Sequence, residues 1–151
     1  MLKPYNDEFF MNQAFLEAQK AYDKGEVPVG AVIVAKNKVI ARTHNLTERL
    51  LDVTAHAEVL ALTAASQFLG AKYLKGCTLY VTLEPCFMCA GALYWSQIDK
   101  VVFACRDKKR GASCCKSNLY HPKTLVVKGP MQEQSSALLK LFFSEKRRSI
   151  I

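Results

Sequence analysis

The sequence predicts an α/β domain in which a mixed sheet lies between helices. Short runs rich in β-branched residues alternate along the chain with amphipathic or Ala- and Leu-rich runs. No internal repeat and no linker-like tract interrupts this alternation. The length of 151 residues, half of them apolar, suits one globular domain with a buried core. We therefore expect a single domain over residues 1–151.

The first elements are a helix and a hairpin. Apolar residues at mostly three- and four-residue spacing predict an amphipathic helix over residues 6–24, and Gly25 follows as its stop. Two apolar runs at 29–35 and 39–43 then predict strands that pair through a turn at 36–38.

The middle elements alternate between helix and strand. Residues 55–69 are rich in Ala and Leu and predict a helix, and the run 77–83 predicts a strand. Pro85 follows that strand and begins a helix that runs to about residue 95, because proline is well tolerated in a first helical turn.

The last third of the chain carries the fourth and fifth strands and the terminal helix. Strands are expected at 100–104 and 125–127, and the residues between them, 106–123, are loop-like and basic. A basic C-terminal helix is expected at about 131–148, which completes four helices and a sheet of five strands.

Charge is distributed unevenly along the sequence. The formal net charge is +8, from 21 Lys and Arg against 13 Asp and Glu. Residues 1–99 hold 9 basic and 10 acidic side chains, a net of −1, whereas residues 100–151 hold 12 and 3, a net of +9. Such asymmetry favours a polyanionic partner, with a merely solvated basic surface as the alternative.

Several classes of protein are not expected. No apolar run approaches the roughly 18 residues that a membrane span requires, and no membrane partner is expected. The first eight residues lack the apolar core of a signal peptide, and neither common Gly-rich phosphate loop is present. We expect a cytoplasmic protein whose six cysteines are thiols or metal ligands rather than disulfides.

Two short motifs together predict a zinc site. His56-Ala57-Glu58 lies at the start of one predicted helix, and Glu84-Pro85-Cys86-Phe87-Met88-Cys89 lies at the start of the next. Cysteines three apart on a helical turn point the same way, and a helix N-terminus favours their thiolates. Two thiolates and one imidazole leave a fourth position open, as in catalytic rather than structural zinc sites.

Two other interpretations of these motifs remain open. One is a redox cysteine pair with an unrelated surface histidine. The other is a structural zinc site closed by a fourth cysteine, for which the candidates are Cys77, Cys105, Cys114 and Cys115.

The combination of motifs matches the signature of zinc-dependent deaminases. In that chemistry zinc supplies an activated water near neutral pH. Glu58, which is not a ligand, would take a proton from the water, pass it to the ring nitrogen beside the attacked carbon, and later protonate the leaving ammonia. An exocyclic amine would thereby become a carbonyl.

The sequence resembles the bacterial tRNA-specific adenosine deaminases of the cytidine-deaminase-like superfamily over roughly residues 7–148. The stretches that carry the resemblance are GEVPVGAV at 25–32, TAHAE at 54–58 and LYVTLEPCFMCAGA at 79–92. The resemblance implies a three-layer α/β/α fold with a central mixed five-stranded sheet, a homodimer, and conversion of the wobble adenosine of a tRNA anticodon loop to inosine. It also implies that one zinc ion per subunit is held by His56, Cys86 and Cys89, with Glu58 as the proton shuttle.

The same resemblance implies a set of substrate-binding residues: Val29, Asn45, Asp107, Phe142, Phe143, Lys146, Arg147 and Arg148. Asn45 would hydrogen-bond the base or its ribose, or else is a simple turn residue, and Val29 would line the base pocket or is an ordinary strand residue. Asp107 would lie near a flanking nucleotide, where a carboxylate accepts from a ribose 2′-hydroxyl.

The remaining residues of that set lie on the terminal helix. Phe142 and Phe143 would approach the RNA or, alternatively, pack in the core. The basic triplet Lys146–Arg148 would reach phosphates, or is a solvated helix end that suits the dipole.

The chain departs from the family pattern after Asp107. Residues 108–123 are fewer than in the family and include two adjacent cysteines, Cys114 and Cys115, which are expected to be free thiols. His121 is expected to be an ordinary loop histidine, with an RNA contact as the alternative. This departure leaves open which tRNA is selected. Two other functions are considered: deamination of a free base, nucleoside or nucleotide such as cytidine, deoxycytidylate or guanine, and a non-catalytic zinc or RNA-binding module.

Overall fold

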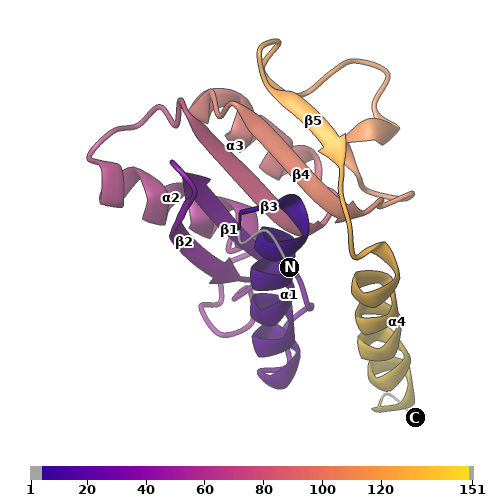
Figure 1. Cartoon of the computed structure of the whole chain (residues 1–151). Helices are drawn as coiled ribbons and strands as arrows, with labels where there is room; N and C mark the ends of the chain where they lie inside the picture. The colour runs from indigo at the N-terminus through magenta and orange to yellow at the C-terminus, as the bar shows by residue number, and fades with distance from the viewer. Residues whose placement is uncertain (1–4, 150–151) are drawn as a thin grey trace.

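A central five-stranded sheet in the order β2-β1-β3-β4-β5 organises the molecule, which is described here by a computed structural model over residues 5–149 (Figure 1). The elements in chain order are α1 (Asp7–Asp23), β1 (Gly30–Ala35), β2 (Lys38–His44), α2 (Ala57–Leu69), β3 (Cys77–Leu83), α3 (Phe87–Ser96), β4 (Lys100–Cys105), the 3₁₀ turn η1 (Ala112–Cys114), β5 (Leu125–Lys128) and α4 (Gln132–Ser149). The ends of the predicted domain, residues 1–4 and 150–151, lie outside the described residues.

The sheet is mixed, as the sequence predicts. β1 pairs antiparallel with both β2 and β3, whereas β3, β4 and β5 run parallel to one another. A parallel pair requires a crossover, which α3 provides between β3 and β4. Between β4 and β5 the crossover is the long segment 106–124, which contains only the short turn η1.

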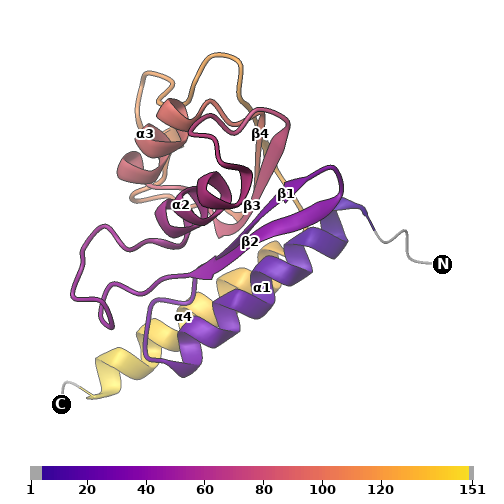
Figure 2. The same cartoon turned by 90° about the vertical axis from the view of Figure 1, so that its left-hand side faces the viewer.

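Helices cover both faces of the sheet. α2 and α3 lie on one face, and α1 and α4 lie on the other (Figure 2). Successive side chains of a strand point to opposite faces, so β1 contributes to both helix layers. Ile33 packs in the apolar cluster on the side of α2 and α3, and Val32 packs against Met11 and Ala14 of α1.

α1 lies close against the start of β1 because of Gly30. A Cβ atom at this position would collide with the backbone of α1 at Ala14 and Ala18. The amide of Gly30 donates to Oγ1 of Thr82 across 3.1 Å. The beginning of β1 is therefore fixed beside the end of β3.

Every predicted helix and strand is present, but two helices begin later than expected. The helix predicted from residue 55 begins at Ala57, and the one predicted from Pro85 begins at Phe87. His56 and Cys86 are therefore N-cap residues with extended backbone conformation. Among residues 5–149, no helix combines the length and the apolar character that a bilayer crossing requires.

Candidate active site

Three potential metal ligands meet where the N-termini of α2 and α3 lie side by side. Nδ1 of His56 lies 3.7 Å from Sγ of Cys86 and 3.4 Å from Sγ of Cys89. Tetrahedral zinc with ordinary Zn–N and Zn–S bonds places a nitrogen about 3.6 Å from a sulfur. The donor atoms thus have both the chemical identity and the spacing that a zinc ion requires.

The cluster contains three ligating side chains. In the described part of the chain, His56, Cys86 and Cys89 form a group whose ligand atoms all lie within 4.8 Å of one another, and no fourth His, Cys, Asp or Glu belongs to it. The other cysteines, at 77, 105, 114 and 115, are free thiols outside the group. This arrangement disfavours a structural zinc site closed by a fourth cysteine.

The two cysteines differ in their affinity for a proton. The Cys89 thiol donates to the Cys86 thiolate, and this bond, assisted by His56, lowers the pKa of Cys86 to about 4 despite partial burial. The same bond, together with burial, raises the pKa of Cys89. A metal ion bound to both sulfurs would displace the thiol proton of Cys89.

Glu58 lies in the first turn of α2, only two residues after His56, and its side chain is 4% exposed. Burial raises the pKa of its carboxyl to about 7, although the charge of the nearby His56 ring acts in the opposite direction. A carboxyl with a pKa near neutrality can both accept and return a proton.

Asn45 and Val29 are both buried beside this site. The backbone N–H of Asn45 donates to the backbone carbonyl of Val29 at 3.1 Å. The side-chain Oδ1 of Asn45 accepts from the backbone N–H of Ala57 at 2.7 Å. Asn45 thus satisfies one of the free N–H groups at the start of α2. Its position is set by the helix that carries Glu58, so it is more than a simple turn residue.

Asp107 is held in place by Glu84, a residue of the cysteine motif to which the sequence analysis assigned no role. Glu84 is 4% exposed; its Oε1 accepts from the amide of Asp107 at 3.0 Å and its Oε2 accepts from the amide of Ser113 at 2.9 Å. Gly111 packs directly against this carboxylate, with no room for a Cβ atom. The only signal in the sequence was a carboxylate placed between an apolar strand and Pro85.

The side chain of Asp107 shapes the following turn. Its Oδ1 accepts from the amides of Lys109 and Arg110, both at 3.0 Å. One carboxylate oxygen is therefore already used within the loop.

A second buried carboxylate, also missed, fixes the segment on the other side of the site. Glu26 is 1% exposed. It accepts from the amide of Glu48 at 3.0 Å and from that of Arg49 at 2.8 Å. Glu26 therefore anchors the loop that follows Asn45.

The two phenylalanines of α4 have different surroundings. Phe142 is buried, with its ring 6.4 Å from that of Tyr22 on α1, so its side chain lies in the contact between the two helices. Phe143 is 45% exposed. Of the two expected roles, RNA contact or core packing, Phe142 thus has the surroundings of a core residue and Phe143 does not.

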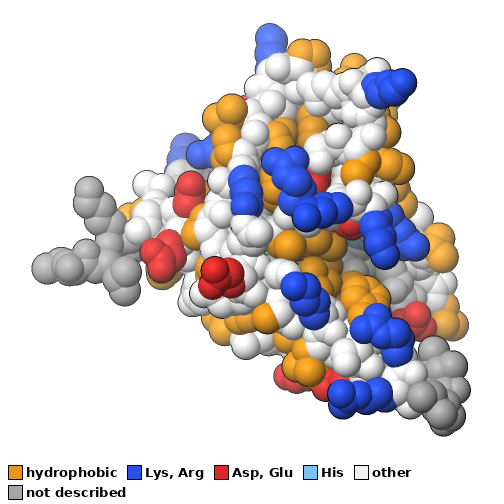
Figure 3. All heavy atoms as spheres, turned by 90° about the vertical axis from the view of Figure 1, so that its right-hand side faces the viewer, with side chains coloured by type: hydrophobic (Ala, Val, Ile, Leu, Met, Phe, Trp, Pro, Cys, Tyr) orange, Lys and Arg blue, Asp and Glu red, His pale blue; other side chains and the backbone are white. Residues whose placement is uncertain are grey.

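The basic triplet Lys146–Arg148 is exposed in the last turn of α4. Figure 3 shows that Lys and Arg side chains are spread over the face of the molecule on the side of β5 and α4. The triplet lies on the layer opposite α2 and α3 (Figure 2), so it is not part of the metal cluster.

His121 has the surroundings of an ordinary loop residue. Its Nδ1 accepts from the amide of Lys123 at 3.1 Å, and its ring lies 5.5 Å from that of Tyr94.

Residues 4–105 match the model of a protein family described as the cytidine and deoxycytidylate deaminase zinc-binding region. The chain is 47% identical to the tRNA-specific adenosine deaminase of Aquifex aeolicus, over 95% of this chain and 98% of that protein. It superposes with a TM-score of 0.82 and 39% identity on a structure from a study of A-to-I editing by tRNA:A34 deaminases at the wobble position of transfer RNA, covering 87% of this chain and 99% of that one. A guanine deaminase from Bacillus subtilis matches with a TM-score of 0.64 and 41% identity, over 67% and 65% of the two chains. The matches confirm the expected three-layer fold.

Proposed function

The chain belongs to the tRNA-specific adenosine deaminases within the cytidine and deoxycytidylate deaminase family, and we propose that it converts adenosine to inosine at the wobble position of a tRNA anticodon loop. The observation that carries the proposal is the meeting of three zinc-type ligands with the buried carboxyl of Glu58 at two adjacent helix N-termini. One domain over residues 1–151 is proposed to carry both the chemistry and the RNA contacts.

His56, Cys86 and Cys89 are proposed to hold one zinc ion per subunit. A zinc ion held there supplies an activated water near neutral pH. The chain itself fixes the positions of the three ligands, because the N-terminus of α2 lies beside the N-terminus of α3.

Glu58 is proposed to move the protons of the hydrolysis. It takes one proton from the attacking water and transfers it to the ring nitrogen beside the attacked carbon. It then delivers the second water proton to the amine, so that ammonia leaves and the water oxygen remains as the carbonyl. Burial supports this role because a carboxyl with a pKa near 7 exchanges protons readily at neutral pH.

The proposed substrate contacts fall into two groups. Val29 and Asn45 lie buried beside the first turn of α2, where they would meet the base. Asp107 would meet a ribose hydroxyl, and Phe143 with the exposed triplet Lys146–Arg148 would meet the RNA further away. Phe142 supports this surface through its packing on α1.

We also propose that the enzyme is a homodimer that works in the cytoplasm. Large apolar side chains are strongly exposed in and before α2 and α3, notably Leu51 (92%), Val53 (84%), Trp95 (76%) and Phe68 (69%). Exposed apolar side chains of this kind mark interaction surfaces. A reducing compartment would keep the thiol ligands available for zinc.

The direct test offers the zinc-loaded protein an anticodon stem-loop with adenosine at the wobble position. Inosine is measured by mass spectrometry after digestion, and the isosteric variant Glu58→Gln serves as the inactive control. The same protein is offered guanine, cytidine and deoxycytidylate, because of its similarity to a guanine deaminase. Turnover of these small molecules without inosine in the stem-loop would overturn the proposal.

X-ray absorption at the zinc edge tests the catalytic nature of the site. We expect two sulfur ligands, one nitrogen ligand and one light oxygen ligand. A shell with three sulfurs and no oxygen would mean that a further cysteine closes the site, and a non-catalytic zinc module would then be the better description.

A further inference from the structure

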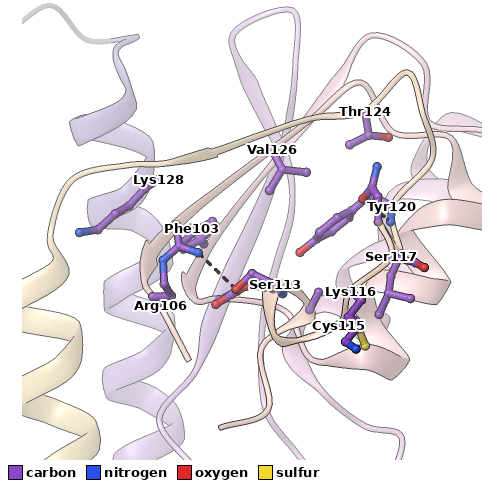
Figure 4. A pocket seen from close by; sticks show the side chains of 14 residues that line it. Phe103, Arg106, Ser113, Cys115, Lys116, Ser117, Tyr120, Thr124, Val126 and Lys128 are labelled. Carbon is purple, nitrogen blue, oxygen red and sulfur yellow. Dashed lines mark hydrogen bonds between the residues drawn. The ribbon is translucent and has the colours of Figure 1, made fainter. Parts of the chain in front are cut away.

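A pocket lies beside β5, and none of the three metal-ligating residues lines it. It has a volume of about 420 Å³ and lies between strands β4 and β5 and the segment 112–120 (Figure 4). The β4–β5 crossover that forms one wall of the pocket contains only the short turn η1 and no longer helix. Its volume is within the range of small-molecule sites.

The hydroxyl of Tyr120 is buried in the wall of this pocket. Tyr120 is 8% exposed, and its hydroxyl forms no hydrogen bond among the described residues. Figure 4 shows the hydroxyl end of the ring directed toward the middle of the pocket. Burial and the nearby carboxylate of Glu84 raise the pKa of Tyr120, so the group remains an O–H donor. A buried donor of this kind is normally paired with an acceptor.

The charges around the pocket favour an anion. Arg106, Lys116 and Lys128 line it, and Glu84 is the one carboxylate among the lining residues. Both oxygens of Glu84 already accept backbone N–H groups. Three cations and one carboxylate give a formal charge of +2, which matches a phosphate monoester with about −1.5 to −2 at neutral pH better than a phosphodiester with about −1.

The remaining walls of the pocket are of two kinds. Phe103, Val126 and Leu119 supply apolar surface, whereas Ser113 supplies a hydroxyl that accepts from the Arg106 guanidinium at 3.2 Å. A ligand that fills the pocket therefore combines an anionic group with a flat apolar part. We propose that this pocket binds a small phosphate monoester of the size and kind of a nucleoside 5′-monophosphate.

This inference goes beyond deamination and does not depend on it. The zinc-loaded protein is titrated with adenosine 5′-monophosphate, adenosine and inorganic phosphate, and binding is followed by calorimetry. We expect at least tenfold tighter binding of the monophosphate than of adenosine. Tyr120→Phe should weaken it about fivefold or more through the loss of one hydrogen bond. The double variant Lys116→Ala/Lys128→Ala should weaken it further.

Lys123→Ala is the matched control for the loss of charge. Lys123 is an exposed lysine of the same crossover and does not line the pocket, so its replacement should leave the affinity unchanged. Thermal melting of each variant checks that the fold is retained.

Alkylation of the unmodified protein gives a readout that needs no variant. Cys115 lines the pocket, whereas the adjacent Cys114 is exposed and lies outside it. Adenosine 5′-monophosphate should slow the reaction of Cys115 with iodoacetamide, measured by peptide mass spectrometry, and should leave the rate at Cys114 unchanged.

Three results would overturn the proposal. They are equal affinity for the monophosphate and adenosine, unchanged affinity in both Tyr120→Phe and the double lysine variant, and equal alkylation of Cys115 with and without ligand. Binding of a 5′-phosphorylated stem-loop through these residues, without binding of the free monophosphate, would also overturn it and assign the pocket to RNA. Inosine formation, measured in parallel, reports separately on the proposed function.

Discussion

Replacement of Glu84 by alanine should loosen the loop that carries Asp107 and destabilise the whole protein. The buried carboxylate accepts two backbone N–H groups, at 3.0 and 2.9 Å. A hydrogen bond to a charged group contributes about 1.5–3 kcal/mol, and two give about 3–6 kcal/mol. Water recovers part of this loss because both bonds are only partly buried, so we expect a destabilisation of about 2–4 kcal/mol.

The assay is urea unfolding of the zinc-loaded protein at neutral pH with linear extrapolation. Glu84→Gln is the matched variant. Its one side-chain oxygen can still accept from one of the two backbone N–H groups, whereas its NH₂ group would face the other N–H and form no bond with it. We expect the parent protein to be the most stable, Glu84→Gln to be intermediate and Glu84→Ala to be the least stable. Hydrogen exchange should increase selectively in residues 106–113, while the zinc content stays the same. A Glu84→Ala variant within 0.5 kcal/mol of the parent, with unchanged exchange in this loop, would refute the reasoning.

Four further predictions concern the metal, the proton shuttle, the basic helix and the apolar surface. Removing zinc with a chelator should abolish inosine formation and lower the Tm, and added zinc should restore both; full activity after chelation contradicts a catalytic metal. Glu58→Ala should keep its zinc, measured by elemental analysis, but its turnover should fall at least about 100-fold. Loss of the metal together with the activity would contradict the role assigned to Glu58. Reversing the charges of Lys146, Arg147 and Arg148 together should weaken stem-loop binding. The slope of log binding constant against log salt concentration should become shallower by about 2, because each lost phosphate contact removes about 0.7. Unchanged binding would make the triplet a solvated helix end. Trp95→Lys should shift the protein toward a monomer in light scattering, and an unchanged mass would exclude Trp95 from the dimer contact.

Much of the fold was predictable because its signals are local. The β-branched run Cys77–Leu83 and the Ala- and Leu-rich α2 differ in period and composition, so each could be assigned without knowledge of its neighbours. The exact first residue of a helix depends on its cap. For that reason α2 and α3 begin two residues later than predicted.

The terminal helix shows the limit of such local signals. Phe142 and Phe143 are adjacent and equally apolar, and the sequence left the alternatives of RNA contact and core packing open for both. The rotation of α4 against α1 buries Phe142 and exposes Phe143. This rotation is set by contact between helices that are more than a hundred residues apart in the chain.

The sequence by itself determined the fold class, the set of zinc-type ligands and the excess of positive charge after residue 99. These follow from residue type and from spacing within a single helical turn, which the backbone geometry fixes. Only the tertiary structure brought His56 to within 3.4 Å of a cysteine from another helix, and only it gave Glu84 its two loop amides. It likewise left the Tyr120 hydroxyl without a partner, among residues 5–149, in the wall of a cationic pocket. The contacts of His56 and Glu84 join residues 23 to 33 positions apart in the chain, and their distances depend on strand order and register, which no short stretch of sequence contains.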